Sequence, residues 1–261
     1  MIALSARTVS QKFKNDFVKA LSDVYGEREA FNMYRLYASE NSKLIAESDV
    51  STEASNQIFA DLEKLIQHYP IQYLLGKTWF FDIEIAVGPG ALIPRPETEE
   101  MIDLILRENH DDSVHVLDIG TGSGCIPLVL KTKKPGWSVV GLDISNAALR
   151  WAKLNARKMN LEISWSEVNI LESDPPQSPF DIIVSNPPYI ALDEERVMSS
   201  STVKHEPREA LFAEDPLQFY RRFVEKMNDW LKPEGKFYFE ISEYRSEDLR
   251  ILLEKQERRF R

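Results

Sequence analysis

A cluster of three glycines constrains the fold more than any other feature of this sequence. Gly120, Gly122 and Gly124 are three of the ten glycines in the chain and fall within five residues. The short apolar run His115–Asp118 precedes them, and a helical pattern follows. Glycine permits a tight turn and lets a ligand approach the main chain. A glycine loop between a strand and a helix is typical of the ligand-binding edge of a parallel sheet.

Apolar runs after residue 94 predict the strands of that sheet. Helical stretches such as Asn146–Lys158 separate the first four runs, and a longer segment precedes the fifth. This alternation predicts an α/β fold, with a mostly parallel, Rossmann-like sheet covered by helices on both faces. The predicted strands are His115–Asp118, Val139–Asp143, Ile163–Val168, Ile182–Ser185 and Phe237–Ile241.

The first third of the chain has a different pattern. Residues 10 to about 75 carry apolar side chains at helical spacing, and Ser51 or Thr52 is suited to cap a helix. Between Trp79 and Ile93 the apolar residues alternate with polar ones, which is strand spacing. We therefore predict a helical bundle over 1–77, a β-hairpin linker over 78–93 and the sheet domain over 94–261.

Charge and cysteine content restrict the class of partner. The formal net charge is −10, and acidic residues outnumber basic ones both before and after residue 90. Neither part offers the basic surface that phosphate backbones favour, so a protein partner is expected rather than nucleic acid. One cysteine and no long apolar run predict a cytoplasmic protein without disulfides or membrane spans. A monomer is expected.

Two aspartates indicate the kind of nucleotide. Asp118 stands two residues before the first glycine, where it would repel the pyrophosphate of a dinucleotide. S-adenosylmethionine has no phosphate and carries an ammonium and a sulfonium, so it suits an acidic loop. Asp143 ends the next predicted strand and can accept hydrogen bonds from ribose hydroxyls. A nicotinamide or flavin, and a tight turn without a ligand, are the alternatives.

The remaining cofactor contacts are predicted from position along the chain. Asn169 follows the third strand and can hydrogen-bond the adenine edge, with Ile144 and Ile170 against the ring faces. A capping or turn role is the alternative for Asn169. The predicted cofactor-binding residues are Asp118, Gly120, Thr121, Gly122, Ser123, Gly124, Asp143, Ile144, Asn169, Ile170 and Asn186.

The tetrapeptide Asn186-Pro187-Pro188-Tyr189 follows the fourth predicted strand and is the predicted catalytic site. Prolines lack an N–H, so nearby carbonyls stay free to accept from a ligand, and their fixed φ stiffens the loop. The Asn186 side chain adds another acceptor, and the Tyr189 ring can lie on a flat group. Two acceptors match a planar, conjugated NH2 group: adenine, cytosine or a glutamine amide. A loop without a catalytic role is the alternative.

Such a nitrogen is a poor nucleophile because its lone pair is delocalised. Orienting it in line with a sulfonium methyl lowers the barrier, and two acceptors bind more strongly as positive charge grows on nitrogen. No strong general base is needed if the proton leaves after methyl transfer. The four histidines are scattered, and the sequence has no metal-ligand cluster.

Taken together, these motifs resemble the peptide-chain release factor N5-glutamine methyltransferases, the HemK/PrmC family. The resemblance covers nearly the whole chain, and its most specific part is Leu92-Ile-Pro-Arg-Pro-Glu-Thr-Glu99. It also includes Pro70-Ile-Gln-Tyr-Leu-Leu-Gly76, the glycine loop, Asp143-Ile144-Ser145, Ser185 to Tyr189, and Glu206-Pro207 followed by Ala210-Leu211. The Asn-Pro-Pro-Tyr motif alone is shared with amino-group methyltransferases acting on DNA and RNA.

The resemblance implies methyl transfer from S-adenosylmethionine to the glutamine amide in the Gly-Gly-Gln loop of a release factor. Asn186 and the Pro187 carbonyl would hold that amide, Tyr189 would pack on it, and the N-terminal bundle would help grip the release factor. Arg95 and Glu97 would shape the floor of the site or form a salt bridge that fixes the linker. The family pattern also implies two more strands after the helix Ser246–Gln256, beginning near Arg258–Arg261, so the C-terminal strands are expected to be incomplete. A nucleic-acid methyltransferase and a non-catalytic binding protein are the rival functions.

Overall fold

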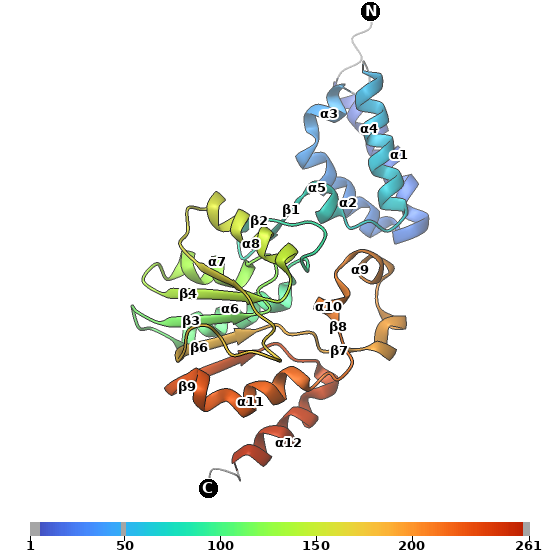
Figure 1. Ribbon diagram of the computed structural model, residues 1–261. Coiled ribbons are helices and arrows are strands. Elements are labelled where there is room, and N and C mark those ends of the chain that lie inside the picture. The colour runs from blue at the N-terminus through green and yellow to red at the C-terminus, as the bar shows by residue number, and fades with distance from the viewer. Residues whose placement is uncertain (1–5, 48–50, 258–261) are drawn as a thin grey trace, which may run out of the picture. The chain divides into compact units, whose positions relative to one another are not determined.

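The computed structural model describes residues 6–47 and 51–257. They group into two compact units (Figure 1). The first comprises the described part of 1–76 together with 200–205, and the second comprises 77–199 with the described part of 206–261. None of the helices in the described ranges combines the length and the apolar character that a membrane crossing requires.

The first unit is helical, as predicted. Phe17, Leu21, Tyr37 and Leu65 are fully buried in its core. Ser51 caps the fourth helix, since its hydroxyl accepts a hydrogen bond from the Ala54 N–H at 3.2 Å. The helices are α1 (Ala6–Tyr25), α2 (Glu27–Glu40), α3 (Ser42–Glu47), α4 (Thr52–Ile66), α5 (Ile71–Leu75) and α9 (Ser200–His205).

The second unit begins with the predicted β-hairpin, formed by β1 (Lys77–Phe80) and β2 (Ile83–Ala86). Phe81 and Asp82 make its turn, and both have positive φ, as two-residue hairpin turns with matching twist require. The hairpin therefore ends at Ala86, and the glycine-proline segment at 88–90 follows it. The predicted linker groups with the sheet unit.

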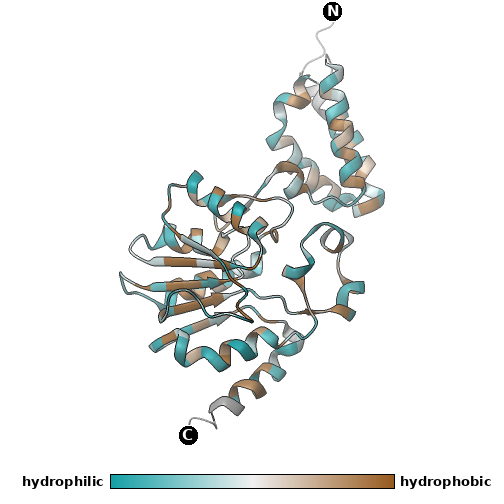
Figure 2. Ribbon diagram, in the orientation of Figure 1, coloured by the Kyte–Doolittle hydropathy of each residue, from teal (hydrophilic) through white to brown (hydrophobic). Residues whose placement is uncertain are grey.

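A five-stranded parallel sheet forms the centre of the second unit, in the order β5-β4-β3-β6-β9. Its strands are β3 (His115–Ile119), β4 (Ser138–Asp143), β5 (Ser164–Glu167), β6 (Phe180–Ser185) and β9 (Leu231–Phe239). Figure 1 shows β4, β3, β6 and β9 side by side, and Figure 2 shows that the central strands β4, β3 and β6 are predominantly hydrophobic. The predicted α/β class with a helical N-terminal region is confirmed.

Helices pack on this sheet and fix the loops at its edge. Phe223 and Trp230 of α11 (Gln218–Trp230) lie in a buried cluster with sheet residues such as Leu142. The helices α7 (Cys125–Lys133) and α8 (Asn146–Lys158) pack on β4, and α6 (Pro96–Glu108) contacts α7 and β9. The short elements are η1 (Leu192–Val197), α10 (Arg208–Leu211), η2 (Glu243–Arg245) and the last helix, α12 (Ser246–Glu257).

Two features of the sheet differ from the sequence prediction. The fifth strand starts at Leu231 rather than Phe237, and a register shift separates its Phe180 and Ile182 pairings. Pro233 and Gly235 lie in that irregular stretch, and they hid its strand character. A small parallel pair, β7 (Ile190–Ala191) with β8 (Phe212–Ala213), was not predicted because each strand has only two residues. Residues 258–261, where a further strand was expected to begin, lie outside the described residues.

Candidate active site

A cavity of about 270 Å³ lies at the carboxyl ends of β3, β4, β5 and β6, just below the ~300–1,000 Å³ typical of small-molecule sites. This is the edge at which parallel sheets bind ligands. Its lining includes Ile119, Gly120, Gly122, Asp143, Ile144, Ser145, Val168, Asn169, Ile170, Leu171, Ser185, Asn186, Pro187 and Pro188. Ala148 and residues from the segments 90–92, 207–212 and 218–219 complete the wall.

The glycine loop forms one side of the cavity. The N–H groups of Gly120 and Thr121 both donate to the Leu142 carbonyl, at 2.9 and 2.8 Å. Gly120, Gly122 and Gly124 have φ of 75°, 57° and 81°, a region that glycine adopts without strain. Gly120 and Gly122 line the cavity, whereas Gly124 packs beneath it against Ala152 and Trp165.

Three buried polar side chains support this loop from below. Asp118, Thr121 and Ser123 are at most 3% exposed and do not line the cavity. No described residue meets hydrogen-bond geometry with their side-chain oxygens. Burial raises the pKa of Asp118 to about 7, an effect opposed by the nearby Thr121 hydroxyl and reinforced by Asp143. The loop therefore rests on a carboxyl group that takes up a proton near neutral pH.

Asp143 joins β4 to the glycine loop. Its carboxylate accepts the Gly122 N–H and the Ser145 N–H, each at 2.8 Å. Burial raises the pKa of Asp143, and these N–H groups oppose the rise. A carboxylate has about four lone-pair sites, so two remain for a ligand. Asp143 thus presents acceptors to the cavity from a fixed position.

The end of β5 forms the apolar part of the cavity. Asn169 closes a local turn, because its side-chain oxygen accepts the Leu171 N–H at 3.1 Å. Its side-chain NH2 remains as the donor end. Ile170 is buried, whereas Ile144 on the neighbouring strand end is 56% exposed although it lines the cavity. The two isoleucines leave an uncovered apolar surface beside a hydrogen-bond donor.

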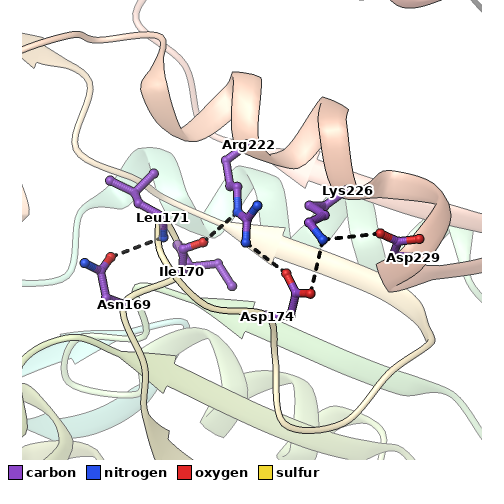
Figure 3. A network of polar contacts seen from close by, with 7 residues as sticks. All are labelled: Asn169, Ile170, Leu171, Asp174, Arg222, Lys226 and Asp229. Atoms are coloured by element: carbon purple, nitrogen blue, oxygen red, sulfur yellow. Dashed lines mark hydrogen bonds and ion pairs between the residues drawn. The ribbon is translucent and has the colours of Figure 1, made fainter.

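A polar network from α11 holds this wall in place (Figure 3). Arg222 Nε donates to the Ile170 carbonyl at 3.0 Å, and its guanidinium also binds Asp174 at 2.9 Å. Lys226, one turn further along α11, binds the other Asp174 oxygen at 3.1 Å. The loop after β5 is therefore tied to α11 through its backbone and through a side chain.

The end of β6 carries the predicted catalytic tetrapeptide. Asn186, Pro187 and Pro188 line the cavity, but Tyr189 does not. The Asn186 side-chain NH2 donates to Thr98 Oγ1 at 3.2 Å, and the Tyr189 hydroxyl donates to Glu240 at 3.0 Å. Burial and the Glu240 carboxylate raise the pKa of Tyr189, so its hydroxyl stays protonated.

An ion pair anchors the wall formed by 207–212. Arg95 binds the buried Glu206 carboxylate at 2.6 Å, and Glu206 also accepts the Ile93 N–H at 3.0 Å. Arg95 thus makes a salt bridge that fixes the segment before α6, one of the two roles considered from sequence. Glu206 precedes Pro207, which lines the cavity.

The structure therefore brings together most of the predicted site residues. Those on the cavity surface are Gly120, Gly122, Asp143, Ile144, Asn169, Ile170, Asn186, Pro187 and Pro188, whereas Asp118, Thr121, Ser123, Gly124 and Tyr189 lie behind it. Sequence reasoning missed Glu240 and Arg222. A charged residue within the fifth predicted apolar run was the available signal for Glu240, and Arg222 carried none.

Comparison with known proteins gives a consistent picture. A family model described as the methyltransferase small domain matches residues 101–214. A release factor glutamine methyltransferase from Streptococcus pneumoniae is 44% identical over 197 residues, covering 75% of this chain and 70% of that relative. One from Flavobacterium psychrophilum is 36% identical over 258 residues, covering 94% and 90%.

Among solved structures, the hMettl16 catalytic domain in complex with MAT2A 3'UTR hairpin 6 matches with a TM-score of 0.50. It is 22% identical, over 66% of this chain and 66% of that chain. This likeness shows a shared fold.

Proposed function

This chain belongs to the family of release factor glutamine methyltransferases, and we propose from this that it methylates release factors. The methyl group passes from the sulfonium of S-adenosylmethionine to the side-chain amide nitrogen (N5) of the glutamine in the Gly-Gly-Gln loop. The S–CH3 bond breaks to leave S-adenosylhomocysteine, and the nitrogen then releases one proton to solvent. The observation that carries the proposal is that Asn186 and Pro187 line the same cavity as Gly120 and Gly122. An acceptor pair for a planar amide and a glycine loop for the donor thus share one space.

The cavity surface fits this donor. Asp143 has free lone pairs for two ribose hydroxyls, and the exposed Ile144 surface with Ile170 matches the faces of an adenine ring. The free NH2 of Asn169 suits a ring nitrogen. Gly120 and Gly122 let the rest of the donor approach the main chain. When bound, S-adenosylmethionine supplies a methyl group on a cationic sulfur.

The support beneath the loop suits a cationic ligand as well. Asp118 and Asp143 are both buried acids near this loop, and a positive charge close to them favours their ionised forms. The phosphates of a dinucleotide would have the opposite effect. Asp118, Thr121, Ser123 and Gly124 act from behind the surface, by supporting the loop.

The loop after β6 would bind the glutamine amide that accepts the methyl group. In our proposal the Asn186 side-chain oxygen and the Pro187 carbonyl accept the two N–H bonds of the glutamine amide. They orient it for in-line attack, a factor worth several kcal/mol of the barrier, and they bind more strongly as charge grows on nitrogen. Pro188 keeps the loop rigid. Tyr189 lies behind the cavity surface, where its hydroxyl donates to Glu240, and it supports the loop from there.

The helical unit is proposed to contribute to release-factor binding, as the family resemblance implies. The acidic composition on both sides of residue 90 supports a protein partner over nucleic acid. A monomer acting in the cytoplasm fits a substrate that serves translation and a chain with a single cysteine.

The direct test uses methyl-labelled S-adenosylmethionine and a purified release factor. We expect label on the wild-type release factor and none on a variant with Gln→Ala in its Gly-Gly-Gln loop. Total RNA and duplex DNA serve as the other substrates. Label that persists on the Gln→Ala variant, or that enters nucleic acid instead, contradicts the proposed substrate.

A further inference from the structure

The side-chain amide of Asn186 has two ends of opposite character. One end is an oxygen that accepts hydrogen bonds, and the other is an NH2 group that donates two. A half-turn about the terminal side-chain bond exchanges them at almost no steric cost. The proposed reaction needs the oxygen to face the glutamine NH2, because two NH2 groups would repel. Something must therefore prevent the amide from turning over.

A chain of hydrogen bonds leads from Asn186 to a carboxylate. Glu240 follows β9 at the carboxyl edge of the sheet, and its Oε2 lies 2.7 Å from Thr98 Oγ1. Thr98 stands in the first turn of α6, is 3% exposed, and lies 3.2 Å from Asn186 Nδ2. Helix α6 starts at Pro96, where proline suits the first helical position.

The polarity of this chain has one solution. An ionised carboxylate only accepts hydrogen bonds, so the Thr98 hydroxyl must donate its single proton to Glu240. The Thr98 oxygen can then only accept, and the group that donates to it must be the Asn186 NH2. The Asn186 oxygen is thereby turned away from Thr98 and remains available to a ligand.

Glu240 is itself held on several sides. Its second oxygen accepts the Tyr189 hydroxyl at 3.0 Å, its carbonyl accepts the Tyr220 hydroxyl at 2.9 Å, and its N–H donates to the Ser185 carbonyl at 3.1 Å. Tyr189 donates as well, because burial and Glu240 raise its pKa. The carboxylate therefore receives a hydroxyl donor on each oxygen and has a fixed orientation.

We propose that Glu240 and Thr98 are positioning residues that fix which end of the Asn186 amide faces the substrate. The proposal rests on the proposed function, since it concerns how the Asn186 side chain binds the glutamine amide of the substrate. Neither residue touches the reacting atoms. Glu240 sets the direction of the hydrogen bonds because its carboxylate accepts from Thr98. Thr98 acts as the relay, since its oxygen then accepts only from the Asn186 NH2.

The first test compares Thr98→Val with Thr98→Ser. Valine keeps the shape but removes the relay, whereas serine keeps the hydroxyl. We expect Thr98→Val to lower kcat roughly tenfold, the usual effect of losing one orienting hydrogen bond, and donor Kd by calorimetry to change less than about twofold. Thr98→Ser should restore most of kcat. Equal losses in both variants would mean that Thr98 only packs.

A double-mutant cycle then separates positioning from general damage. In an Asn186→Ala background there is no amide to orient, so Thr98→Val should cause no further loss of kcat. Additive losses overturn the proposal. Should Thr98→Val not fold, as judged by urea unfolding, Glu240→Gln replaces it and is judged by the same two criteria. The glutamine introduced by Glu240→Gln has an NH2 group that can donate to Thr98, which reverses the direction of the hydrogen bonds to Asn186.

A substrate analogue tests directly which end of the Asn186 amide faces the substrate. A release factor with Glu in place of the loop glutamine presents a carboxylate, which the Asn186 oxygen should repel in the wild type. In Thr98→Val the amide is free to turn its NH2 toward that carboxylate, so the analogue should inhibit several-fold more strongly. An unchanged inhibition constant counts against the inference. Absence of methylation by the wild-type protein would instead refute the proposed function.

Discussion

Asn155 of α8 is hydrogen-bonded twice to the backbone of Ala86 in β2. Its side-chain oxygen accepts the Ala86 N–H at 2.8 Å, and its NH2 donates to the Ala86 carbonyl at 3.0 Å. The same NH2 donates to the Ser123 carbonyl at 3.0 Å. The buried Asn155 amide thus makes the two hydrogen bonds to Ala86 that a neighbouring strand would otherwise make. It also connects the hairpin to the glycine loop through Ser123.

Replacing Asn155 with alanine should destabilise the second unit. It would leave three buried backbone groups without these partners, at a cost of about 1–3 kcal/mol for each group that water does not reach. We expect a loss of roughly 2–4 kcal/mol in the free energy of unfolding, measured with urea. Arg150→Ala, at an exposed site on the same helix, is the control. Equal effects of the two variants would show that the amide contributes little.

Asp143 and Asn186 are predicted to act on different steps. Asp143→Ala should weaken donor binding roughly tenfold or more, because hydrogen bonds to a charged group contribute about 1.5–3 kcal/mol each. Asn186→Ala should lower kcat roughly a hundredfold, as for the loss of a group that stabilises a transition state, with a modest change in donor affinity. Calorimetry gives the first quantity and initial rates at saturating donor give the second. The reverse pattern would mean that the roles are exchanged.

Arg222 is predicted to tune donor affinity without touching the donor. Arg222→Ala removes the bond to the Ile170 carbonyl and loosens the loop that forms the apolar wall (Figure 3). We expect donor Kd to rise several-fold, roughly the effect of one hydrogen bond, with kcat at saturating donor nearly unchanged. Lys226→Ala is a matched control, since Lys226 binds Asp174 but not Ile170. If both variants weaken binding equally, the ion pairs matter and the backbone contact does not.

Asp118 should make the stability of the protein depend on pH. Its pKa is raised from 3.8 to about 7 in the folded state, so between those values the folded protein holds a proton that the unfolded chain has released. The unfolding free energy contributed by this group is therefore present at low pH and lost as pH rises from about 4 through 7, with a slope of up to about 1.4 kcal/mol per unit.

The measurement compares Asp118→Asn with the wild type by urea unfolding in the absence of donor, from pH 5 to 8. Asparagine keeps the shape and cannot ionise, so the variant should lose this contribution to the slope and gain stability relative to the wild type at pH 8. Parallel pH curves for the two proteins would show that Asp118 is ionised throughout this range.

The elements that sequence predicted well are those with strong periodicity. The apolar runs of β3, β4 and β6 and the spacing in α8 determine burial directly, so their positions followed from the residues. Leu231, where β9 begins, could not be found in the same way, because the proline and glycine after it belong to a bulge that only the pairing with Phe180 defines.

The positions of the candidate-site residues were predictable to a similar extent. The glycines and Asp143 belong to strand ends, and the parallel sheet brings such ends together. Glu240 and Thr98 lie 142 positions apart in the chain, and their hydrogen bond depends on how α6 packs beside β9. Such a partnership has no local signal. The same holds for Arg222, whose contact with Ile170 arises from the docking of α11.

The cavity takes its walls from residue 90 to residue 219, and this breadth makes the methyl donor a folding ligand. The binding surface is complete only when all of these wall segments are folded, so unfolding of any one of them weakens binding. By mass action, donor at a hundred times its Kd adds about 2.7 kcal/mol to the stability of the folded state. The amount of intact enzyme in a cell would then follow the supply of the metabolite it consumes, and starvation for that metabolite would expose the chain to proteolysis.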